Sequence, residues 1–168
     1  CAKLLENGQV DFIITNYPNS ALSNTQNIKM LRPFHDVFAA NEEFFPLKGR
    51  KLSLEELQTY PILMLDKKST TSEFLHSMFQ KHQLDLVPEI ELSSNDLLID
   101  LAKIGLGIAF VPDFCIPSSD SSLFILELEE ALPERQLVVV HNESIPISQA
   151  ARQFMELLGG REREQEEA

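Results

Sequence analysis

Short apolar runs of strand length, separated by helical segments, are the feature of this sequence that most constrains its fold. Between the runs, apolar residues recur at spacings of three and four, as on one face of a helix. This alternation predicts an α/β fold in which mostly parallel strands are buried on both faces. The predicted strands cover residues 10–15, 34–39, 62–65, 89–92, 107–111, 123–128 and 136–141.

The predicted helices are marked by capping residues at their starts. Ser53 stands three residues before a glutamate in a capping box, and Thr70 opens the same Thr-x-x-Glu spacing. Ser94 is typical of an N-cap, and a last helix is predicted to begin near 146–148 and to stop at 159–160.

The net charge argues against direct binding of nucleic acid by this chain. The chain has 168 residues, of which 14 are basic and 26 acidic, and its net charge is −12. Such a charge repels a phosphate backbone. The length is sufficient for one core or for two small lobes.

The cysteines and the hydropathy predict a soluble protein of a reducing compartment, hence a cytoplasmic location. Cys1 and Cys115 form neither a CxxC pair nor a disulfide framework. No apolar run approaches the ~20 residues that cross a bilayer, and the chain does not open on a secretory signal. Because residues 1–6 resemble the last turns of a helix, we expect a preceding segment in the parent protein.

The sequence shows no catalytic, cofactor or metal motif. The Gly105-x-Gly107 pair precedes a predicted strand, so it is interpreted as a helix stop with close backbone packing. The sequence has no Gly-x-Ser-x-Gly elbow, no His-Glu-x-x-His helix and no phosphate-binding loop. The histidines lack metal-ligand spacing; they are His35, His76, His82 and His141.

Segments in the right order and at the right distances resemble the effector-binding domain of LysR-type transcriptional regulators. These segments are 4–14, with its helix, glycine and Asp-strand run, 54–63, 105–112 and 147–154. The resemblance implies a two-lobed α/β fold like that of type 2 periplasmic binding proteins, with two crossover strands and a ligand cleft between the lobes.

The same resemblance implies a domain division. Lobe I would hold residues 1–39 and 140–160, lobe II would hold 40–139, and 161–168 would be a charged tail. The first lobe is expected to be incomplete, because the first strand, helix and second strand of the family pattern are absent. The winged helix-turn-helix and the linker helix are absent too, so DNA would be bound only through that missing part.

Two predicted helix starts are rich in hydroxyl groups and suit a small polar or anionic ligand. Free backbone N–H groups and the positive end of the helix dipole can hold an anion there, although the same residues can simply cap their helices. The resemblance places both starts at the cleft and so favours binding. The candidates are Ser69, Thr70, Thr71, Ser93, Ser94 and Asn95.

Further candidate ligand-binding residues lie at the ends of predicted strands. Thr15 and Asn16 come at the end of the first predicted strand, where open α/β sheets bind ligands, and the resemblance also implies a polar contact near them. Pro112, just after its strand, could line the pocket or only pack. Lys67 and Lys68 are left out, because lysines in such loops usually face solvent.

The resemblance therefore implies a sensor of a small-molecule effector, not an enzyme. Effector binding would change the geometry of the lobes and, through it, DNA binding and transcription. The helix predicted at 95–104 would contact a neighbouring subunit in a homo-oligomer. The alternatives are an extracytoplasmic solute-binding protein of a transporter and an enzyme on the same fold.

Overall fold

The computed structural model describes residues 1–23, 26–117 and 121–160, and its chain forms two compact units. Unit 1 contains residues 1–33 and the chain from Arg135 onward, and unit 2 contains Phe34–Glu134. The predicted lobe boundaries, after residues 39 and 139, lie later along the chain than these two crossing points. The predicted charged tail, 161–168, lies outside the described residues.

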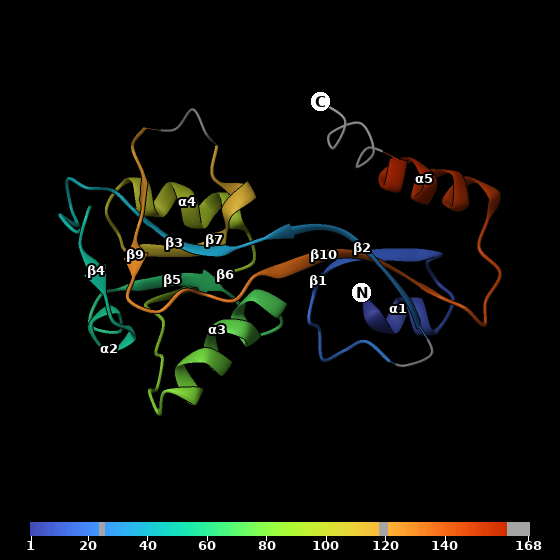
Figure 1. The fold of residues 1–168 in the computed structure, drawn as a ribbon, viewed down its shortest axis with the longest axis horizontal. Helices are drawn as coiled ribbons and strands as arrows, with labels where there is room; N and C mark the ends of the chain where they lie inside the picture. The colour runs from blue at the N-terminus through green and yellow to red at the C-terminus, as the bar shows by residue number, and fades with distance from the viewer. Residues whose placement is uncertain (24–25, 118–120, 161–168) are drawn as a thin grey trace. The chain divides into compact units, whose positions relative to one another are not determined.

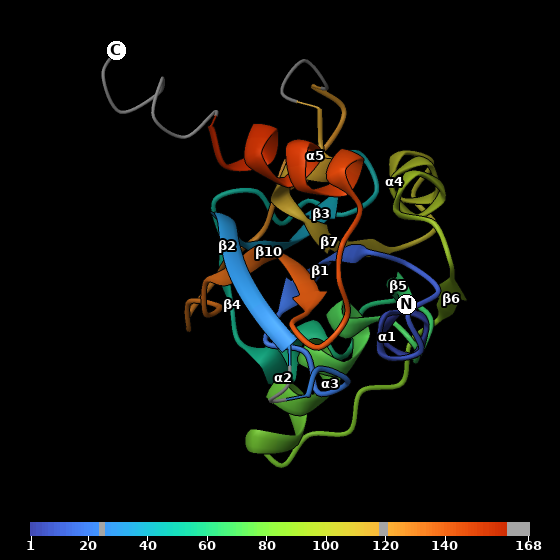
Figure 2. The same ribbon diagram turned by 90° about the vertical axis from the view of Figure 1, so that its right-hand side faces the viewer.

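Unit 1 is built on a three-stranded sheet in the order β1-β10-β2 (Figures 1 and 2). Strands β1 and β10 are antiparallel, with a register that runs from Phe12 opposite His141 to Tyr17 opposite Gln136. Its elements are α1 (Ala2–Glu6), β1 (Phe12–Tyr17), β2 (Gln26–Phe34), β10 (Arg135–Asn142) and α5 (Gln149–Gly160).

The last helix starts at a serine that is fixed to the beginning of β1. The Ser148 hydroxyl donates to a carboxylate oxygen of Asp11 at 2.7 Å and accepts the N–H of Ala151 at 3.2 Å. The rings of Phe12 and Phe154 stack with their centroids 5.6 Å apart. These contacts hold α5 against β1, and the start of the helix agrees with the prediction.

Unit 2 is a five-stranded sheet in the order β6-β5-β7-β3-β8, with α3 and α4 on opposite faces (Figure 1). A small parallel pair, β4 and β9, lies beside it. The elements are β3 (Asp36–Ala40), β4 (Lys51–Leu52), α2 (Leu54–Leu57), β5 (Ile62–Leu65), α3 (Thr70–Lys81), β6 (Ile90–Leu92), α4 (Asn95–Lys103), β7 (Ile108–Pro112), η1 (Asp113–Cys115), β8 (Phe124–Ile125) and β9 (Glu127–Leu128).

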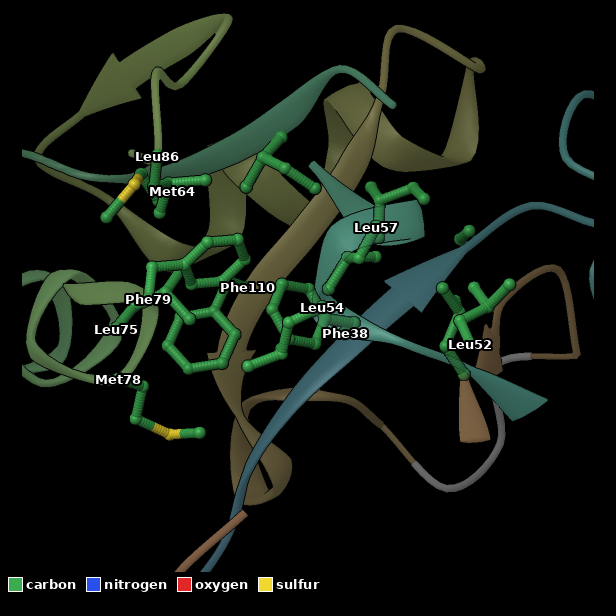
Figure 3. Packing of buried hydrophobic residues seen from close by; sticks show 14 of the residues in the cluster. Phe38, Leu52, Leu54, Leu57, Met64, Leu75, Met78, Phe79, Leu86 and Phe110 are labelled. Atoms are coloured by element: carbon green, nitrogen blue, oxygen red, sulfur yellow. The ribbon is translucent and has the colours of Figure 1, made fainter. Parts of the chain in front are cut away.

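The central strands β5 and β7 are buried on both faces because their side chains alternate between two cores. Met64 and Phe110 point into the core formed with α3, which Figure 3 shows from close by. Their neighbours Leu63 and Val111 belong to the second core, which α4 covers. The unbroken apolar runs of these strands follow directly from this double burial.

Hydroxyl caps begin the helices of unit 2, with one correction to the predicted positions. Ser53 and Ser94 cap α2 and α4 as predicted. For α3 the cap is Ser69, whose hydroxyl accepts the N–H of Thr71 at 3.2 Å, and Thr70 is already the first helical residue. The Thr-x-x-Glu spacing therefore placed this cap one residue too late, since Ser69 keeps the extended backbone that a cap needs.

The strand directions confirm the prediction only in part. Parallel pairing joins β5 to β6 and to β7, which are the strands reached through helical crossovers. In contrast, β3 runs antiparallel to β7 and β8, and β1 runs antiparallel to β10. The predicted strand at 34–39 is β3, and the one at 123–128 is divided into β8 and β9.

Candidate functional site

Residues that follow three parallel strands meet at one edge of the unit 2 sheet. Because β5, β6 and β7 are parallel, their carboxyl ends lie at the same edge. We call residues 66–71, 93–95 and 112–115, which follow or end these strands, the carboxyl edge. It contains every predicted site residue of unit 2: Ser69, Thr70, Thr71, Ser93, Ser94, Asn95 and Pro112.

Hydrogen bonds join parts of the carboxyl edge to one another and to the end of β6. The N–H of Asp66, after β5, donates to the carbonyl of Leu92 at the end of β6, at 2.8 Å. The side-chain amide of Asn95, at the start of α4, donates to the Cys115 sulfur at 3.5 Å. These bonds fix the segment after β5 to the end of β6, and the start of α4 to the turn after β7.

The predicted hydroxyl residues differ in what they offer a ligand. Ser93 is exposed, and Ser69, Thr70 and Ser94 are half-buried. Thr71 is buried, and its N–H is bonded to the Ser69 cap. The exposed and half-buried hydroxyls are therefore the ones that a solute can reach in this conformation.

Aspartates at or beside the carboxyl edge are the residues that sequence reasoning missed. Asp66 and Asp113 directly follow β5 and β7, and each carboxylate accepts a backbone N–H, from Lys68 at 3.0 Å and from His35 at 3.2 Å. The signal that could have found them is their position just after a buried strand. The aspartates of this region are Asp36, Asp66, Asp96 and Asp113.

The Cys115 thiol reports the electrostatic character of this edge. Burial raises the pKa of the Cys115 thiol above its ordinary value, and the Asp96 carboxylate raises it further. The hydrogen bond from Asn95 lowers this pKa, whereas the charges of Asp36 and Asp113 raise it. The thiol is therefore kept protonated, in a region where negative charge accumulates.

Pro112 is the buried last residue of β7, where it lies opposite Asp36 in the register with β3. It begins the short turn Asp113–Cys115 that carries the last part of the carboxyl edge.

Thr15 and Asn16 lie in unit 1, within β1 and not at the end of the strand as predicted. Strand β1 begins later than predicted and continues through Tyr17, with Thr15 opposite Val138 and Asn16 opposite Leu137. Both residues are half-buried. The Thr15 hydroxyl accepts the side-chain amide of Asn19 at 3.0 Å.

The described part of the chain lacks two kinds of feature. Residues 1–23, 26–117 and 121–160 contain no group of three or more His, Cys, Asp or Glu side chains placed to hold a metal ion. In the same residues, no helix combines the length and the apolar character needed to cross a bilayer.

The chain matches one protein-family model and is similar to known transcriptional regulators. The model of the LysR substrate binding domain matches residues 1–163. The chain is 25% identical over 124 residues to the HTH-type transcriptional activator CmpR of Synechocystis sp. (strain ATCC 27184 / PCC 6803 / Kazusa). This alignment covers 73% of the chain and only 41% of CmpR, so the chain spans less than half of that relative.

Solved structures show the same fold. The CcmR regulatory domain of Synechocystis PCC6803, in complex with 2-PG, superimposes with a TM-score of 0.82 at 22% identity, covering 94% of this chain and 76% of that one. The effector-binding domain of QuiR in complex with shikimate gives 0.79 at 16% identity, covering 96% and 76%. Full-length HypT of Salmonella typhimurium gives 0.74 at 22% identity, covering 95% and 54%.

Proposed function

Because the chain belongs to the LysR substrate binding domain family, we propose that it is the effector-sensing part of a bacterial transcriptional regulator. Units 1 and 2 are proposed as its lobes I and II. The relative CmpR is a transcriptional activator, which supports regulation over solute transport or catalysis as the role of this chain. We also propose that the protein is cytoplasmic and has no enzymatic activity.

The proposed ligand is a small polar or anionic metabolite, and the carboxyl edge is the observation that supports it. Two helix N-termini with hydroxyl caps at Ser69 and Ser94 offer N–H and O–H groups to a carboxylate or a phosphate. The neighbouring aspartates can accept hydrogen bonds from hydroxyl or amine groups of the same molecule. Thr15 and Asn16 are proposed as the contacts that unit 1 contributes. Small molecules bound in the CcmR and QuiR structures agree with this proposal.

A metabolite screen with the full-length regulator tests the effector and the site together. We expect at least one metabolite to raise the melting temperature, and Ser94→Ala to weaken its binding about tenfold, measured by isothermal titration. The matched control is Ser53→Ala, which removes the equivalent cap of α2, far from the carboxyl edge in the sequence. Both variants should lose about 1 kcal/mol of folding stability.

Either of two results would count against this proposal. One is a broad screen in which no metabolite stabilises the regulator. The other is equal effector affinity in the Ser94→Ala and Ser53→Ala variants, since lost capping alone affects both.

We further propose that the complete regulator is a homo-oligomer that contacts its partner through α4. Leu97 on this helix is 53% exposed, and Ile104, its C-cap residue, is 62% exposed. The half-buried Leu101 lies between them at helical spacing. Such a stripe on an otherwise folded unit is typical of an interface. DNA binding is proposed to reside in the part of the regulator that precedes this chain.

Charge placed on the stripe should weaken the oligomer. We expect Leu97→Glu combined with Ile104→Glu to shift the full-length regulator toward monomer by at least about tenfold in dissociation constant, measured by analytical ultracentrifugation. The control Val87→Glu alters an aliphatic side chain that is 79% exposed in the same unit but not on α4. An unchanged sedimentation profile for the double variant would remove α4 from the interface.

A further inference from the structure

A pocket of unit 2 lies between α3 and the segment that leads into β6. Its volume is about 500 Å³, inside the range of roughly 300–1,000 Å³ found for small-molecule sites. We propose that this pocket binds a small aliphatic amino acid. The residues that carry the argument are Lys67, Glu73, His76, Asp85, Leu86 and Val87.

Opposite charges line the same pocket. Lys67 supplies an ammonium group, and Glu73 and Asp85 supply carboxylates. Within the described residues, Lys67 and Asp85 form no hydrogen bond or ion pair with another side chain. A zwitterion matches this lining, because its carboxylate can pair with Lys67 and its ammonium with Asp85.

The lining also selects against other classes of small molecule. It carries two carboxylates and one ammonium group, so a dicarboxylate or a phosphate ester meets net repulsion. A simple amine lacks a partner for Lys67, and a simple acid lacks one for Asp85. Only a ligand with both charged groups pairs with both Lys67 and Asp85.

An apolar wall completes the argument. Leu86 is part of the α3 core, whereas the next residue, Val87, is 79% exposed and presents an aliphatic surface at the pocket. An aliphatic ligand side chain would remove this surface from water.

This inference does not depend on the proposed effector function, because none of these residues is among the proposed effector contacts. Lys67 nevertheless lies two residues before the Ser69 cap of α3. An occupied pocket would therefore restrain the segment that carries this cap.

The test compares L-leucine with two analogues that each lack one charged group. The protein is titrated with L-leucine, 3-methylbutylamine or 4-methylpentanoate, and the methyl resonances of Leu86 and Val87 and the ring resonances of His76 are followed by NMR. We expect saturable binding of L-leucine with a dissociation constant of about 1 mM or lower. Each analogue should bind at least about tenfold more weakly.

Neighbouring lysines provide the matched variants. Lys67→Gln should weaken the binding of L-leucine about tenfold. It should leave the binding of 3-methylbutylamine nearly unchanged, because this amine has no carboxylate that could pair with Lys67. Lys68→Gln removes the same charge from the next residue, which does not line the pocket, and should leave L-leucine binding unchanged. Asp85→Asn should weaken the binding of L-leucine and of 3-methylbutylamine, but not that of 4-methylpentanoate.

Three outcomes would overturn the inference. The first is the absence of saturable shifts at these resonances up to about 10 mM L-leucine. The second is an analogue that binds as tightly as L-leucine. The third is equal weakening by Lys67→Gln and Lys68→Gln, which would indicate a general effect of charge on the protein surface.

Discussion

Replacing Phe110 with alanine is expected to lower the free energy of unfolding by about 4 kcal/mol. Phe110 lies in β7, at the centre of the unit 2 sheet, and its side chain is fully buried. Its ring centroid is 4.7 Å from that of Phe38 on the adjacent strand β3 (Figure 3). The alanine variant loses this aromatic contact and leaves a cavity that rigid strands on both sides cannot close. Urea denaturation followed by circular dichroism measures the loss.

The control for this experiment is a phenylalanine close to the same strand in the sequence. Phe114 lies in the short turn after β7 and is exposed, and its ring makes an edge contact with that of Phe34 at a centroid distance of 5.4 Å. Phe114→Ala should therefore cost about 1 kcal/mol. Equal losses for the two variants would mean that Phe110 is not an anchor of this core.

The burial that makes Phe110 important is also what made the fold of unit 2 predictable from sequence. A strand covered on both faces must be apolar at every position, and the run at 62–65 has this pattern over the same residues as β5. The start of α4 was equally clear, because Ser94 is an extended residue whose side chain caps the helix. Both the apolar run of β5 and the capped start of α4 can be recognised within a short stretch of the sequence.

Unit 1 was less predictable because its sheet lacks such local signals. Strand β2 covers nine residues but was not predicted. Its buried positions, Gln26, Leu31 and Phe34, do not alternate, and Pro33 near its end is unusual in a strand. The pairing partners that make this segment a strand lie far away in the sequence, so no short window contains them.

The candidate site was predictable where it coincides with helix starts and not elsewhere. Ser69 and Ser94 are recognisable as caps, whereas Asp113 looks like any surface carboxylate until β7 is known to run parallel to β5. The positions of Thr15 and Asn16 depended on where β1 ends, and strand ends are poorly marked in a sequence. Long-range pairing therefore limits what the sequence can assign to the site.

The same long-range pairing explains the position of Gly107, whereas Gly105 meets a local need of the backbone. Gly105 has a φ of +79°, which ends α4 in the left-handed region, as the sequence predicted for a helix stop. Gly107 has no such backbone requirement. It is needed because the strand that follows passes very close to the residue before β5.

Gly107→Ala is therefore expected to lower the free energy of unfolding by about 3 kcal/mol, although it adds a single methyl group. A Cβ atom at this position would lie 2.5 Å from the carbonyl oxygen of Pro61, which accepts the N–H of Ile108 at 2.8 Å, and 2.8 Å from the Leu63 side chain. Relief of these contacts requires β5 and β7 to separate at the point where their pairing begins. The control Gly49→Ala has a φ of +76° but no atom within 4 Å of the added Cβ, so it should cost only about 1 kcal/mol. Thermal and urea unfolding of both variants measure the difference, and a larger loss for Gly49→Ala would show that backbone conformation, not the contact between β5 and β7, is what demands glycine in this unit.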